Sequence, residues 1–225
     1  MIGPAQLAPP LTEQADDIER VWNVFLIGAL VLGGLVVALI LFIVARFRRR
    51  GPTLPRQVRE NIPFEIAYTL VPLLVVSALF AVTFVTVDAM DVGDDDASEL
   101  TVHVTGFQWQ WQFDYEPSGV RVRGTDVARP ELVLPTGADV RFDLTSVDVI
   151  HSFWIPGFRF KRDLFPGQTQ SFRVEIGDVA GDFPDSGVCA EFCGLDHTSM
   201  RFDVRIVTPE EFAAWEQERL EEAAP

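Results

Sequence analysis

Two long uncharged stretches, Val21–Ala45 and Ile66–Val87, most constrain what this chain can fold into. Each is longer than the roughly 20 residues that a helix needs to cross the hydrocarbon core of a bilayer. A buried helix of a soluble protein normally keeps a polar stripe, and "VFLIGALVLGGLVVALILFIVA" has none. We therefore predict a transmembrane helical hairpin over residues 21–88, in contact with membrane lipid.

The charges around the two stretches predict their orientation. The loop at residues 46–62 carries six arginines, namely Arg46, Arg48, Arg49, Arg50, Arg56 and Arg59. Short arginine-rich loops stay in the cytoplasm. The segment after the second stretch is acidic, with Asp88, Asp91, Asp94, Asp95 and Asp96. Residues 1–20 lack the basic and apolar regions of a signal peptide. We expect a two-span plasma-membrane protein with residues 1–20, both termini and the remaining chain outside.

The outer part is acidic. The net charge is −15 and Lys161 is the only lysine. An acidic face could steer a basic redox partner. Alternatively, the organism lives in strong brine as an extreme halophile, where a Debye length of about 3 Å at 1 M salt would screen such steering. The spread of acidity along the outer part favours the brine interpretation, and we expect no nucleic-acid partner.

After an acidic linker at 89–98, residues 99–208 show strand patterns. "FQWQWQFDY" alternates aromatic and polar residues, which predicts one strand, and Gly106 is a candidate for a bulge in it. "ELVLP", "DVRFDLTS", "QSFRVEI" and "RFDVRIV" follow between turn signals. This spacing predicts an antiparallel sandwich or barrel. Thr208, Pro209 and Glu211 then form a capping-box pattern, which predicts a short, exposed, purely structural helix within 209–225.

The stretch "GVCAEFCGLDHTSM" gathers Cys189, Cys193, His197 and Met200. Two cysteines outside the cell usually form a disulfide, although three intervening residues give only a modest entropic gain. Thiolate, imidazole and thioether together favour copper, with zinc as competitor. Zinc has little use for methionine, and a mononuclear blue-copper site needs only one cysteine. Two thiolates can instead bridge two metal ions.

A second imidazole must then come from elsewhere in the chain. His103 lies in the alternating stretch "TVHVT", where it is best interpreted as an exposed strand residue. His151 lies in "DVIHSFWIPGF", at the end of a strand and before a turn that contains proline. We select His151 because an edge loop can meet another loop.

The pattern Cys-x-Glu-x-Cys-Gly-x-x-His-x-x-Met resembles the dinuclear copper A site of cytochrome c oxidase subunit II. The resemblance extends to the two spans, "FEIAYTLVP", "GFQWQW" and "DVIHSFWIP". It implies a cupredoxin-like Greek-key sandwich or barrel over residues 99–208. It also implies a redox subunit of a haem-copper oxidase, an enzyme that reduces O2 to water and pumps protons. This subunit by itself would have no oxidase turnover.

The resemblance implies specific ligands. Cys189 and Cys193 would bridge the coppers, and His151 and His197 would each hold one ion. Met200 would be the weak ligand of one copper, and the Glu191 carbonyl that of the other. The Glu191 side chain would reach a magnesium ion shared with subunit I, the haem-bearing partner. From the residues alone, Glu191 is equally a solvated loop residue.

Two further roles follow from the resemblance. Trp109 would be where the donor's electron enters, although the alternation also fits a core-facing stripe. Glu65 would lie at the mouth of a proton channel, although an acid in a helix's first turn also stabilises the dipole. Phe107 and Gln110 stand where the family usually has histidine and tyrosine. The donor is therefore expected to be a cytochrome c or a small blue-copper protein.

Two alternatives stay open at this point. The first is a copper A subunit of a related nitric oxide reductase, which differs in its acceptor. The second is a non-redox protein, namely a membrane-anchored copper carrier or a disulfide-bonded β-domain. A related quinol-oxidase subunit is disfavoured because that class lacks the copper ligands.

Overall fold

A computed structural model describes residues 9–48, 51, 58–90, 98–125 and 127–224. The chain divides into two compact units. One unit is helical and comprises Ile18–Asp91; the other is rich in β-structure and comprises Met1–Asp17 and Val92–Pro225. The described residues before Ile18 therefore group with the β-rich unit.

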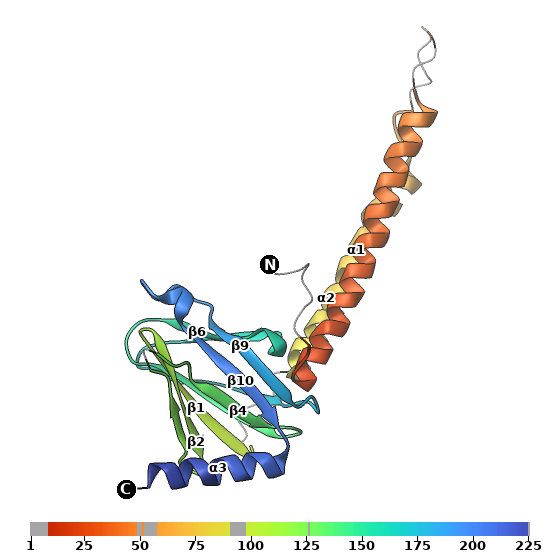
Figure 1. The fold of residues 1–225 in the computed structure, drawn as a ribbon. Helices are drawn as coiled ribbons and strands as arrows, with labels where there is room; N and C mark the ends of the chain where they lie inside the picture. Colours follow the sequence, from red (N-terminus) through yellow and green to blue (C-terminus); the bar gives the residue numbers. More distant parts are fainter. Residues whose placement is uncertain (1–8, 49–50, 52–57, 91–97, 126, 225) are drawn as a thin grey trace. The chain divides into compact units, whose positions relative to one another are not determined.

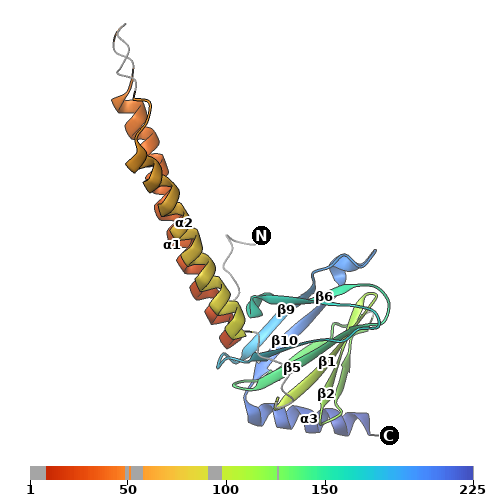
Figure 2. The same cartoon turned by 180° about the vertical axis from the view of Figure 1, so that it is seen from behind.

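The helical unit is made of α1 (Glu13–Arg46), from Ile18 onward, and α2 (Ile62–Met90), which overlap along much of their length in both views (Figures 1 and 2). Both helices are long and apolar enough to cross a membrane, and their large apolar side chains are exposed along their lengths. This confirms the two predicted apolar helices, and α1 begins at Glu13 rather than near Val21. Arg49, Arg50, Arg56 and the predicted acidic run Asp91–Asp96 lie outside the described residues.

The described part of the β-rich unit contains ten strands in two five-stranded sheets. The first sheet has the order β3-β2-β1-β5-β8, and the second has the order β4-β10-β9-β6-β7. The strands of the first sheet are β1 (Leu100–Phe107), β2 (Gln110–Glu116), β3 (Arg121–Arg123), β5 (Asp139–Ser146) and β8 (Gln170–Glu175). Those of the second are β4 (Glu131–Pro135), β6 (His151–Ile155), β7 (Phe160–Leu164), β9 (Gly181–Cys189) and β10 (Arg201–Val207).

The predicted sandwich is confirmed, but the expectation of purely antiparallel pairing is wrong. β1 pairs with β5 in parallel, and β10 pairs with β4 in parallel, while the other strand pairs are antiparallel. Alternation in a sequence indicates which side chains face the core, not which strand lies alongside. The direction of β1 relative to β5 depends on long crossovers between the sheets, and these leave no periodic signal.

The stretch "FQWQWQFDY" is not one strand, as predicted, but two. β1 ends at Phe107, Gln108 and Trp109 form the turn, and β2 begins at Gln110, which pairs with Phe107. Aromatic and polar residues alternate in the sequence through the turn, although Phe107 lies on the outer face with Gln110 and Trp111 faces the core. The sequence pattern therefore conceals the turn. Gly106 is not in a bulge, because β1 pairs with β2 in continuous register through it.

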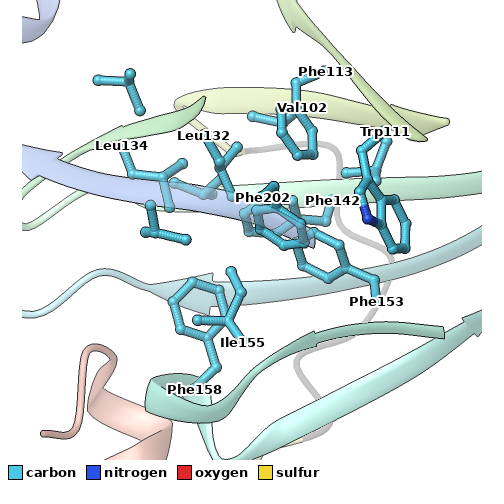
Figure 3. Close-up of a cluster of buried hydrophobic side chains, with 14 of the residues drawn as sticks. Val102, Trp111, Phe113, Leu132, Leu134, Phe142, Phe153, Ile155, Phe158 and Phe202 are labelled. Atoms are coloured by element: carbon cyan, nitrogen blue, oxygen red, sulfur yellow. The ribbon is translucent and has the colours of Figure 1, made fainter. Parts of the chain in front are cut away.

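An aromatic core joins the two sheets beneath the end of the sandwich that carries the site. Phe153 of β6 stacks on Phe202 of β10 with ring centroids 5.1 Å apart, and Trp111 of β2 meets both rings edge-on (Figure 3). Trp111, Phe153 and Phe202 are almost fully buried. The beginnings of β6 and β10 are therefore held by rigid rings, which fixes the loops attached to them.

The C-terminal helix α3 (Pro209–Ala223) has the predicted capping box between Thr208 and Glu211. It is less exposed than expected, because Phe212 and Trp215 are buried. The Trp215 ring lies 5.0 Å from that of Tyr115, edge to face. The amphipathic helix thus closes one end of the sandwich.

The residues before α1 belong to the β-rich unit. The Leu11 N–H donates to the Gly157 carbonyl at 2.9 Å, and the Gly177 N–H donates to the Leu11 carbonyl at 3.0 Å. The Leu11 side chain is 2% exposed and lies directly over Gly157, where an added Cβ would come within 2.6 Å of it. This segment is therefore an integral part of the outer domain rather than a free external end.

We predict that Leu11→Ala lowers the free energy of unfolding of the outer domain by about 2–5 kcal/mol, the usual cost of removing a buried leucine side chain. Leu220→Ala is the matched control, because that leucine is 44% exposed on α3. Denaturant unfolding followed by tryptophan fluorescence measures both. Equal stability of the two variants would contradict the packing of Leu11.

Candidate metal centre

The candidate ligands come from two loops at one end of the sandwich. β9 ends at Cys189, which pairs with Phe153 of β6, and β6 begins at His151. The sequence suggested that His151 ends a strand, but in the structure it is the first residue of β6. The Ala190 N–H donates to the Ser152 carbonyl at 2.9 Å. Strand pairing thus brings together a histidine and a cysteine that are 38 residues apart in the sequence.

The two thiols and two imidazoles form a continuous series. His151 Nδ1 lies 3.8 Å from Cys189 Sγ, which lies 3.9 Å from Cys193 Sγ, which in turn lies 3.6 Å from His197 Nδ1. The ligand atoms of His151, Cys189 and Cys193 all lie within 4.8 Å of one another. The structure therefore brings all four predicted residues together, with one imidazole beside each sulfur.

Two weaker donors complete the set. Met200 Sδ lies 3.7 Å from Cys193 Sγ, and the Glu191 carbonyl oxygen lies 3.2 Å from Cys189 Sγ. Each sulfur thus has a different weak donor beside it. Two thiols, two imidazoles and a thioether are the soft donors that copper prefers, so the residues present fit a copper site.

Most of the candidate ligands are shielded from solvent, His197 is half-buried, and both cysteines are free. His151 and Met200 have no exposed surface, and Cys189 and Cys193 are 7% and 3% exposed. A disulfide requires sulfur atoms about 2.05 Å apart, close to half the distance observed here. This arrangement disfavours the disulfide-bonded alternative.

The surroundings shift the two thiols in opposite directions. Burial opposes a Cys189 thiolate, but hydrogen bonds with His151 and the backbone outweigh it and lower the pKa of Cys189. Burial and the adjacent Cys189 raise the pKa of Cys193 to about 12. Cys189 therefore loses its proton at a lower pH than an ordinary thiol, whereas Cys193 retains its proton until a cation compensates the second negative charge.

His151 is held by an acid three residues before it in the sequence, Asp148. Asp148 Oδ1 lies 2.9 Å from His151 Nε2, which leaves Nδ1 facing the cysteine sulfur. Burial opposes a charged His151, but contacts with Cys189 and Asp148 outweigh it and raise its pKa. A carboxylate behind a ligand histidine commonly fixes its ring orientation.

Gly106 has a packing role instead of the predicted bulge. A Cβ at this position would lie 3.1 Å from His151 Cδ2 and 3.2 Å from Leu164 Cδ2. The absence of a side chain therefore allows β1 to pass close behind the imidazole ring, which supports its position.

Trp109 is half-buried beside the cysteine loop rather than in the core stripe. Its indole Nε1–H donates to the Cys193 carbonyl at 3.2 Å. The adjacent Gln108 also binds this carbonyl, a contact that sequence reasoning missed because 85 residues separate the two positions. The turn between β1 and β2 therefore lies directly against the ligand loop.

Other predicted residues lie outside the series. The Glu191 side chain is exposed, although its carbonyl lies beside Cys189. Glu65 belongs to the helical unit, where its Oε1 accepts from the Asn61 N–H at 3.1 Å in the first turn of α2. His103 lies on the outer face of β1, where it faces Glu116 and Asp143, in agreement with its interpretation as a strand residue.

Comparisons with known proteins agree with this geometry. A family model described as "Cytochrome C oxidase subunit II, periplasmic domain" matches residues 119–207. The probable cytochrome c oxidase subunit 2 of Streptomyces avermitilis is 38% identical, over 90% of this chain and 75% of that protein. The cytochrome c oxidase subunit 2 of Corynebacterium diphtheriae is 32% identical, over 94% of this chain and 74% of that protein.

A solved structure supports the fold of the outer domain. The periplasmic domain of subunit II of cytochrome oxidase from Bradyrhizobium japonicum is similar with a TM-score of 0.51 and 30% identity. The match covers 56% of this chain and 97% of that one. Two apolar helices followed by this domain indicate a membrane protein with an extracellular domain. The matches confirm the resemblance seen in the sequence, and the chain belongs to the cytochrome c oxidase subunit II family.

Proposed function

We propose that this chain is the electron-accepting subunit of a terminal haem-copper oxidase. It takes single electrons from an external donor and passes them to haem in subunit I, where O2 is reduced to water with proton pumping. The observation that carries this proposal is the unbroken series His151, Cys189, Cys193 and His197, with contacts of 3.6–3.9 Å. The chain alone has no oxidase turnover.

The series supports a division of roles among the ligands. Cys189 and Cys193 would bridge two copper ions, while His151 and His197 would each bind one of them. Met200 and the Glu191 carbonyl would be the weak ligands, because each lies beside a different sulfur. When bound, the copper pair would accept and release one electron at a time.

The protein's own contribution is a largely buried set of ligands that neighbouring residues hold in place. Asp148 and Gly106 fix the His151 ring, and the paired β6 and β9 fix Cys189. Electron transfer needs no open coordination position, so burial of His151, Cys189, Cys193 and Met200 is compatible with this role. Ligands held by their neighbours would change position little between the two oxidation states.

Trp109 is the residue at which we expect electrons to enter. Its half-buried ring lies at the turn between β1 and β2, and its indole N–H binds the carbonyl of a ligand cysteine. A short bonded route therefore leads from this ring to the sulfur of Cys193. The donor would be a cytochrome c or a small blue-copper protein.

Three finer assignments rest on the family resemblance. The exposed Glu191 side chain would reach a magnesium ion shared with subunit I. Glu65 would lie at a proton-channel entrance, although its bond with the Asn61 N–H also fits a helix-capping role. The arginine-rich loop would lie in the cytoplasm, with both termini and the copper domain outside.

We predict that the full-length chain, reconstituted in detergent, binds two copper ions and shows one unpaired electron shared by both nuclei in its paramagnetic resonance spectrum. His151→Ala should abolish the shared signal and lower copper affinity by more than about 100-fold, beyond the usual effect of an outer partner. His103→Ala is the matched control and should behave as the unmodified chain, because His103 lies on the outer face of β1. A single bound copper in the unmodified chain would contradict the dinuclear proposal.

Copper affinity should rise with pH. The pKa of Cys193 is raised to about 12, so this thiol is protonated at neutral pH and must release its proton on binding metal. For each proton released, affinity should increase about tenfold per pH unit below that pKa. Competition with a chelator of known proton affinity between about pH 6 and about pH 8 measures this slope. A flat or falling affinity would show that Cys193 is not a ligand.

Trp109→Phe should slow electron transfer from an external donor, because it removes the indole N–H that contacts Cys193, while the copper spectrum stays recognisable. Trp154→Phe is the control, since this tryptophan is 37% exposed on β6 and is not among the site residues. Stopped-flow reduction of the copper-loaded chain measures both rates. Equal rates in the two variants would place the entrance for electrons elsewhere.

A further inference from the structure

The turn between β1 and β2 makes two polar contacts with one carbonyl group of the ligand loop. The Gln108 Nε2–H donates to the Cys193 carbonyl at 2.7 Å, and the Trp109 Nε1–H donates to the same oxygen at 3.2 Å. Both lone pairs of this carbonyl are therefore used. The carbonyl belongs to a proposed bridging cysteine, so its orientation is linked to that of the sulfur.

Gly194 makes this close approach possible. Its φ is +122°, and a Cβ there would lie 3.1 Å from Gln108 Nε2 and 3.2 Å from Trp109 Nε1. A larger residue would be strained by that backbone conformation and would push the turn away. The loop is thus shaped to receive the Gln108 amide.

Gln108 also contacts the other ligand loop, through its backbone. The Gln108 N–H donates to Asp148 Oδ2 at 2.8 Å. Asp148 Oδ1 accepts from the Val149 N–H at 2.7 Å and lies 2.9 Å from His151 Nε2. Gln108 therefore connects Cys193, by its side chain, with Asp148 and His151, by its main chain.

We propose that Gln108 is a positioning residue of the metal centre, which holds the two ligand loops in register with each other. This inference rests on the proposed function. Gln108 does not touch the ligand sulfur or imidazole atoms directly, and acts through the Cys193 carbonyl and Asp148. Partners outside the ligands fix ligand orientation, and their loss typically costs about 10- to 100-fold in metal affinity.

The chemistry of the contact requires a neutral donor of this length. A glutamate would direct a carboxylate towards a carbonyl oxygen and lose the N–H donor. An asparagine is one methylene shorter and would not reach the carbonyl from the same backbone position. A leucine keeps a similar volume and removes the hydrogen bond alone.

The test compares Gln108→Leu with Gln112→Leu in the full-length chain. Gln112 is the matched control, because it lies on the neighbouring strand and its Nε2 donates to Asp114 rather than to the ligand loop. Copper affinity is measured by competition with a chelator, and the copper signal by paramagnetic resonance. We expect Gln108→Leu to lose about 10- to 100-fold in affinity and to change the hyperfine splitting, and Gln112→Leu to change neither.

A second variant, Gln108→Asn, keeps an amide and should shift affinity and splitting in the same direction. The proposal is overturned if both Gln108 variants match Gln112→Leu in affinity and splitting while the unmodified chain binds its copper pair. It is also overturned if both Gln108 variants lose affinity but keep the hyperfine splitting of the unmodified chain, and if their copper-free chains unfold at a lower temperature than that of Gln112→Leu. That result would indicate a merely structural role. If the unmodified chain binds no copper pair, the proposed function fails first.

Discussion

The contact between two buried sulfur atoms is the constraint on which the rest of the outer domain depends. Cys189 and Cys193 lie 3.9 Å apart and are almost fully buried. Two thiolates at that distance repel each other, and burial strengthens the repulsion, so the pair is suited to a bound cation. The strand pairing of β9 with β6 and the stacked rings of Phe153 and Phe202 prevent the loop from relaxing.

At this end of the sandwich, the turn between β1 and β2 lies close to the candidate ligands. Trp109 reaches the Cys193 carbonyl from a two-residue turn, and Asp148 reaches both that turn and His151. An electron carrier needs such proximity, because its donor stays outside while its ligands must stay dry. Short strands with tight connections meet both needs, since the two cysteine sulfurs and His151 are buried although most of the loop at residues 190–199 is exposed.

The sequence indicated which candidate ligands lie together better than it indicated the strands around them. Four candidate ligands lie within twelve residues, so their spacing is a local signal, whereas His151 required a choice between two histidines. The turn at Gln108 and Trp109 was missed because alternation continues through it, and β9 was missed because Gly181, Pro184 and Gly187 interrupt its pattern. The contacts of Gln108 with Cys193 depend on crossovers between sheets, which no local pattern encodes.

The departures of this chain from the usual family pattern lie away from the ligands. Phe107 lies under the guanidinium of Arg123, at 4.5 Å from ring centroid to Cζ. The Gln110 amide donates to the Thr125 carbonyl at 2.9 Å, and its side chain packs over Gly124. Both positions flank the turn without contacting a candidate ligand in the described contacts. Phe107 and Gln110 therefore shape the surface beside Trp109 and make no described contact with the candidate ligands.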